Sequence, residues 1–256
     1  MSQNSKNPDR ETKSKGSYPL RGRIGLAIAW LFWVITAFFI GALLAQGLWW
    51  LLDIVGLPVS AMNESVESAV MAALLYVASL VVAIAVPRAL KKISVTQDLL
   101  GLHRPLSWSD IGLGAVGIIP YLLISAVLTN VAVAIIPGFD LQQAQDVGFS
   151  GVGDRLGVSL AFVTLVIIAP LAEEMLFRGV LFGELRKLVG FVGATFFVSL
   201  GFALLHGQLN VGIDVFALSI ILCSLREVTG SIWAGVILHM TKNGIAFFFL
   251  FVQPML

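Results

Sequence analysis

Three short groups of polar residues interrupt hydrophobic stretches toward the C-terminal end of this 256-residue chain. They read Glu173-Glu174-x-x-x-Arg178, Phe202-x-x-x-His206 and His239-x-x-x-Asn243. An ionisable side chain at membrane depth is costly unless it is paired or functional, so each group indicates a site. Because all three follow one another between residues 173 and 243, we interpret them as parts of one site inside a membrane.

The first group predicts different roles for its two carboxylates. Glu174 and Arg178 are four residues apart, so on a helix they lie on one face and can form an ion pair. Glu173 points about 100° away and lacks that partner. We therefore predict that Glu174 and Arg178 support the structure and that Glu173 is the free carboxylate.

The spacing along the chain also predicts that the groups share one depth. If the hydrophobic segments on either side of Leu188 form an antiparallel hairpin, Glu173 precedes the turn by 15 residues and His206 follows it by 18. A rise of about 1.5 Å per residue then places both roughly 22–27 Å from the turn. The last hydrophobic segment can bring His239 and Asn243, which share a helix face, to a comparable level.

Glutamate, two histidines and an asparagine suit hydrolysis by water. A carboxylate and an imidazole can activate water, while a second imidazole and an amide bind the oxyanion that develops when an amide is hydrolysed. Alternatively, Glu173, His206 and His239 could hold a zinc ion. We favour Glu–His activation without a metal, because the neutral amide of Asn243 suits an oxyanion donor better than a ligand set. The residue pattern leaves the cofactor unknown.

The composition is typical of a membrane protein with several spans. Hydrophobic residues make up 58% of the chain and charged residues 12%, with a mean hydropathy of +0.94. Soluble domains have about 25% charged residues. The hydrophobic runs are residues 24–52, 68–86, 111–136, 157–182, 190–205, 211–225 and 232–252. They predict an all-α, polytopic bundle of about seven to eight transmembrane helices.

The distribution of charge predicts the domains and their orientation. Residues 1–23 are expected to form a disordered basic tail, and residues 24–256 a single transmembrane bundle with its catalytic core at about 157–252. Basic loops alternate with acidic ones, so the positive-inside rule places the N-terminus in the cytoplasm and the loop at 55–67 outside. The net charge is +1 and no basic stripe forms, so we expect no nucleic-acid partner.

Taken in order, the three groups resemble the motifs of the type II CAAX prenyl endopeptidase family. Its bacterial branch, often called CPBP or Abi, is described as intramembrane metalloproteases and bacteriocin self-immunity proteins. The resemblance rests on EEMLFR at 173–178, FALLH at 202–206 and HMTKN at 239–243. By motif position it implies that Glu173 and His206 activate water, and that His239 and Asn243 stabilise the oxyanion.

This resemblance implies an integral protein of the bacterial plasma membrane with endopeptidase activity. The expected partners are membrane lipid and a peptide or lipidated-protein substrate, either prenylated or a bacteriocin-like or signal-peptide-like precursor. Two other classes stay open. One is a catalytically silent bacteriocin-immunity or scaffold protein. The other is a small transporter that uses the buried acid and histidine as a proton relay, although transporters more often show an internal repeat.

Overall fold

The computed structural model describes residues 19–91, 99–141, 148–149, 152 and 154–253. Within these residues the chain forms helices and turns without a strand, which confirms the predicted all-α class. The α-helices are α1 (Leu20–Ile54), α2 (Glu64–Lys91), α3 (Trp108–Val116), α4 (Ile118–Ile135), α5 (Arg155–Phe162), α6 (Ala169–Glu174), α7 (Phe182–Leu205), α8 (Leu209–Thr229) and α9 (Trp233–Phe247). Three π-helical segments, Val163–Ile168, Met175–Leu181 and Phe248–Val252, and a 3-10 turn at Val59–Ala61 complete the described elements.

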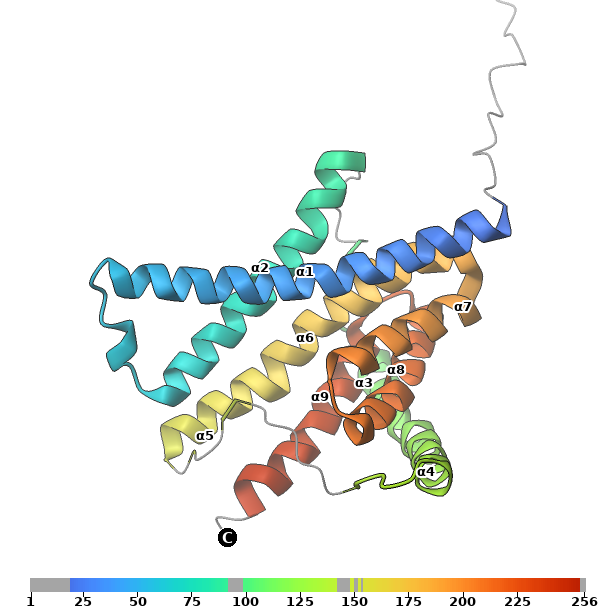
Figure 1. The fold of residues 1–256 in the computed structure, drawn as a ribbon. Coiled ribbons are helices and arrows are strands. Elements are labelled where there is room, and N and C mark those ends of the chain that lie inside the picture. The colour runs from blue at the N-terminus through green and yellow to red at the C-terminus, as the bar shows by residue number, and fades with distance from the viewer. Residues whose placement is uncertain (1–18, 92–98, 142–147, 150–151, 153, 254–256) are drawn as a thin grey trace, which may run out of the picture.

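Among the described residues, five helices are long and apolar enough to cross a membrane. They are Leu20–Ile54, Glu64–Leu90, Trp108–Ile135, Arg155–Leu205 and Trp233–Val252. This is fewer than the expected seven to eight, partly because two predicted segments form one 51-residue helical run. That run is kinked at Gly190, whose φ of 75° favours glycine. The chain turns back there (Figure 1), two residues beyond the predicted turn at Leu188.

The boundary predicted for the N-terminal tail is wrong by four residues. Helix α1 begins at Leu20, directly after Pro19, so residues 20–23 are helical instead of part of the tail. Arginine is a good helix former, so Arg21 and Arg23 can extend the helix beyond its apolar run. The remainder of the predicted tail, residues 1–18, lies outside the described residues.

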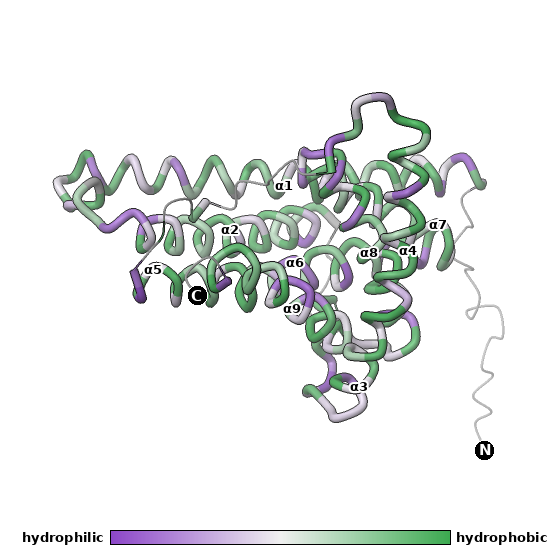
Figure 2. The backbone as a smooth tube through the Cα atoms, turned by 90° about the horizontal axis from the view of Figure 1, so that it is seen from below, coloured by the Kyte–Doolittle hydropathy of each residue, from purple (hydrophilic) through white to green (hydrophobic). Residues whose placement is uncertain are grey.

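Helices α7, α8 and α9 each contact several of the other helices. Helix α1 crosses α2 and also packs on α7, while α8 contacts α4, α7 and α9 (Figure 1). Hydrophobic residues cover much of each helix, and hydrophilic residues interrupt them where α6 and α9 meet (Figure 2). The largest buried cluster includes Phe177, Leu181 and Phe202, from the segment after α6 and from α7. The site residues therefore lie against the main hydrophobic core.

The π-helical segments Val163–Ile168 and Met175–Leu181 flank α6 on its two sides. In the π-helical segment before it, the Ala169 N–H bonds to the Thr164 carbonyl, five residues earlier. Pro170 has no N–H, so it cannot continue this pattern to the Leu165 carbonyl. The side chain of Asn243 on α9 donates to that carbonyl instead, at 3.0 Å. Asn243, from the third polar group, thus bonds a backbone carbonyl that lies shortly before the two glutamates.

Candidate active site

The structure brings both glutamates to one histidine. Glu173 and Glu174 end α6, and His239 lies on α9, which packs against α6. His239 Nδ1 is 3.1 Å from Glu174 Oε1, and its Nε2 is 3.7 Å from Glu173 Oε2. The His239 side chain is 4% exposed and that of Glu173 is 15% exposed. The imidazole therefore lies between the two carboxylates at the edge of the core.

Glu174 forms the ion pair predicted from its spacing. Arg178 Nη1 donates to Glu174 Oε1 at 2.9 Å, and both side chains are fully buried. The Arg178 guanidinium lies over the Phe202 ring, 4.6 Å from its centroid. The same Glu174 oxygen also accepts from His239, so this carboxylate contacts a candidate catalytic group as well as its structural partner. Close approach of α9 requires Gly235, since a Cβ there would lie 2.9 Å from Glu174 Oε2.

Glu173 is not the free carboxylate that the sequence predicted. The hydroxyl of Tyr76, on α2, donates to Glu173 Oε1 at 2.7 Å. The sequence analysis missed Tyr76, which lies 97 residues away and belongs to none of the three polar groups. The signal that could have found it is a hydroxyl inside the hydrophobic run 68–86, where a buried Tyr O–H usually finds a partner.

His206 caps the end of α7 and has a defined tautomer. Its Nδ1 is 2.8 Å from the Phe202 carbonyl, which can only accept. Nδ1 therefore carries the proton, and Nε2 of the neutral ring is left as an acceptor. Glu173 and His239 are both electrostatic neighbours of this ring. The Phe202 ring packs edge-on against both imidazoles, with centroid distances of 4.9 Å to His206 and 5.8 Å to His239.

Asn243 lies farther along α9 and is partly buried. One N–H of its amide is used by the Leu165 carbonyl. A carboxamide nitrogen carries two N–H groups, so one remains for another acceptor. Within the described part of the chain, Asn243 is bonded to the segment before α6 and to neither imidazole.

The side chains present do not fit the metal site considered from the sequence. Across the described residues, no three His, Cys, Asp or Glu side chains are grouped so as to hold a metal ion. Tyr76 binds Glu173 Oε1 and the Phe202 carbonyl binds His206 Nδ1, which leaves Glu173 Oε2 and His206 Nε2 as the atoms of these two side chains that can face a ligand. No step of the chemistry is therefore assigned to zinc.

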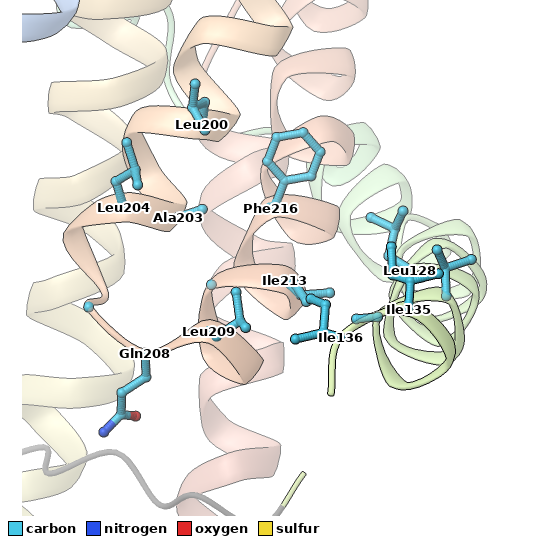
Figure 3. A pocket seen from close by; sticks show the side chains of 14 residues that line it. Leu128, Ile135, Ile136, Leu200, Ala203, Leu204, Gln208, Leu209, Ile213 and Phe216 are labelled. Atoms are coloured by element: carbon cyan, nitrogen blue, oxygen red, sulfur yellow. The ribbon is translucent and has the colours of Figure 1, made fainter. Parts of the chain in front are cut away.

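An apolar cavity of about 550 Å³ is lined in part by Gly207, the residue that follows His206. It is bounded by α4, the end of α7 and the start of α8, and it includes Gly207 and Gln208, which directly follow His206. Figure 3 shows side chains such as Leu128, Ile213 and Phe216 from the different helices. Gln208 is the polar residue at its rim. The cavity offers an apolar surface that begins one residue after His206 in the sequence.

Comparison with known proteins relates part of this chain to one endopeptidase family. Residues 155–245 match the family model described as "Type II CAAX prenyl endopeptidase Rce1-like". A curated relative, "Membrane-embedded CAAX protease MroQ" of Staphylococcus aureus (strain USA300), is 33% identical over 106 residues. These residues cover 39% of this chain and 42% of the relative, so the chain spans less than half of the relative's length. No solved structure matches.

The matched region contains all six site residues predicted from the sequence. The chain therefore carries a type II CAAX prenyl endopeptidase Rce1-like region, which confirms the resemblance seen in the three motifs. Together with the five apolar helices, this match supports an integral membrane protein.

Proposed function

We propose that this protein is an intramembrane endopeptidase that hydrolyses a peptide bond of a membrane-associated substrate. The observation that carries the proposal is the convergence of Glu173 and Glu174 on His239, within the region that matches an endopeptidase family. In this arrangement Glu173 can act as the base, His239 can act as a hydrogen-bond donor, and Glu174 supplies a negative charge beside His239.

Glu173 and His206 activate the water in this proposal. The water lies between Glu173 Oε2 and the unprotonated Nε2 of His206, and Glu173 takes its proton as the oxygen attacks the carbonyl carbon. This forms a tetrahedral intermediate with a negative oxygen. When the C–N bond breaks, the protonated Glu173 returns the proton to the leaving amine, so that acid and amine products account for all atoms of the water and the amide.

His239 and Asn243 stabilise the negative oxygen in this proposal. The Glu174 carboxylate accepts the His239 Nδ1–H, and in the protonated ring the Nε2–H donates to the oxyanion. The second N–H of the Asn243 amide is the other donor. Arg178 holds Glu174 in place through their ion pair, which gives this buried pair an indirect part in the reaction.

We propose a substrate with an apolar segment or a lipid group. The apolar cavity at Gly207 and Gln208 supports this proposal, and the relative's name describes a CAAX protease. We further propose a bacterial plasma membrane location with the N-terminus in the cytoplasm, which the alternation of basic and acidic loops supports.

Comparative proteomics tests the proposed activity. Membrane and secreted peptides of cells with the wild type are compared with those of cells with Glu173→Ala. Glu184→Ala is a matched control, because Glu184 is a carboxylate of the same helical run that pairs with Lys187 outside the site. We expect uncleaved precursors only with Glu173→Ala. Identical peptide sets in all three strains would instead favour a catalytically silent immunity or scaffold protein.

A further inference from the structure

The Tyr76 hydroxyl is a buried polar group that the three motifs do not include. Tyr76 lies on α2, outside the matched region 155–245, and its helix packs against α6. Its hydroxyl donates to Glu173 Oε1 at 2.7 Å. Its ring packs edge-on against Phe38 of α1, with centroids 6.3 Å apart. The hydroxyl is thus placed by two helices that have no other part in the site described above.

The two oxygens of Glu173 consequently face different partners. Oε1 accepts from Tyr76, and Oε2 is 3.7 Å from His239 Nε2. The last torsion of a glutamate side chain has a broad energy minimum, so a carboxylate without a fixed partner can rotate. A hydrogen bond to a charged acceptor is stronger than one between neutral groups and restricts that rotation.

We propose that Tyr76 is a positioning residue for Glu173: its hydroxyl holds Oε1, so that Oε2 is the oxygen turned toward the histidines and the attacking water. This inference rests on the endopeptidase function proposed above. The proposed active site then extends beyond the matched residues 155–245, because α1 and α2 help to orient Glu173.

Tyr76→Phe tests the inference because it removes the hydroxyl and keeps the ring against Phe38. The probe is an internally quenched peptide with a farnesylated cysteine three residues from its C-terminus, cleaved by the purified full chain in detergent micelles. We expect kcat to fall between about tenfold and a hundredfold, with KM changed by less than about twofold. A lower kcat with a nearly unchanged KM indicates that the variant loses stabilisation of the transition state and not binding of the substrate.

The matched control is Tyr121→Phe. The Tyr121 hydroxyl also donates to a carboxylate, Asp214 Oδ1, at 2.8 Å, but on α4 and α8. It should leave kcat near the wild-type value. Phe38→Leu serves as a second control, since it loosens the packing of the Tyr76 ring and keeps the hydroxyl. An equal fall of kcat in Phe38→Leu would mean that packing matters and the hydroxyl does not.

A double-mutant cycle with Glu173→Asp shows whether Tyr76 acts through Glu173. The shorter carboxylate is drawn back from Tyr76, so adding Tyr76→Phe should lower kcat further by less than about twofold. A full, independent effect in this background would overturn the inference, as would wild-type kcat in Tyr76→Phe while Glu173→Gln is inactive. If the wild type and Glu173→Gln both leave the probe uncut, the proposed function itself fails and takes the inference with it.

Discussion

His239 donates from Nδ1 to Oε1 of Glu174 at 3.1 Å, across 65 residues of sequence. The same oxygen holds Arg178 at 2.9 Å. This buried Glu174 oxygen therefore contacts both Arg178, its ion-pair partner, and His239, whose other ring nitrogen lies near Glu173. Glu174 thus contacts both its structural partner and a candidate catalytic group, whereas Glu173 contacts Tyr76 and His239. The two neighbouring acids should respond differently to the same substitution.

Glu173→Gln should abolish cleavage and leave the protein folded in the membrane. The substitution keeps the shape of the side chain and removes the base, so we expect kcat to fall by at least about a hundredfold. Turnover of the farnesylated peptide and the melting temperature in detergent measure the two effects. Glu184→Gln is the control for a change of charge alone. Wild-type turnover by Glu173→Gln would refute its role as the base.

Glu174→Gln should lower stability as well as activity. Arg178 is fully buried and would lose the negative charge that compensates it, which typically destabilises a protein by about 3–5 kcal/mol. Thermal unfolding in detergent checks this. Glu227→Gln is the comparison, because it breaks the ion pair with Arg186 at the surface and should have little effect. Equal melting temperatures for Glu174→Gln and the wild type would show that the buried pair contributes no stability.

Asn243→Ala should have two separable effects. It leaves the Leu165 carbonyl without its donor, which should destabilise the protein by about 1–3 kcal/mol, and it removes the proposed oxyanion donor. Pro170→Ala supplies a backbone N–H that can bond the same carbonyl. In that background the loss of stability should shrink while the loss of kcat persists. Recovery of both would mean that Asn243 only braces the helix.

Removal of metal should leave the activity unchanged. The grouping of the described side chains does not fit a metal ion, and hydrolysis is assigned to Glu173 and His206. We expect elemental analysis of active protein to find no stoichiometric zinc, and 1,10-phenanthroline to leave peptide turnover intact. Zinc whose removal and return switch activity off and on would instead make Glu173, His206 and His239 its candidate ligands.

The orientation is tested by cysteine labelling in a Cys223→Ser background. Leu57→Cys lies in the exposed turn after α1, and Arg88→Cys lies near the end of α2. With the N-terminus in the cytoplasm, an impermeant maleimide should label residue 57 from outside and residue 88 only after the membrane is opened. The reverse pattern would invert the proposed topology.

Local spacing predicted the parts of this molecule that depend on local geometry. The i, i+4 rule identified the Glu174–Arg178 pair, and the gap between two hydrophobic runs placed the turn within two residues of Gly190. The partner of Glu173 was not predictable in this way. Tyr76 reaches it from 97 residues away, through the packing of α2 on α6.

The bond between Glu174 and His239 was missed for the same reason, since it depends on how closely α9 approaches α6 at Gly235. The number of spans is not confirmed, because one of the five candidate runs contains two predicted segments that turn back at Gly190.

The π-helical segments on either side of α6 affect the direction in which the site residues point. Each π turn contains one more residue than an α turn, so it changes the direction in which all later side chains point. Deleting one residue between Val163 and Ile168 would let the run close into a regular α-helix and leave α5 and α6 in the same relative orientation. Closing the π turn without a deletion would instead turn the face of α6 by about 100° relative to α5, carrying Glu173 away from Tyr76. The extra residue before α6 therefore sets the direction of Glu173, although it belongs to none of the three motifs.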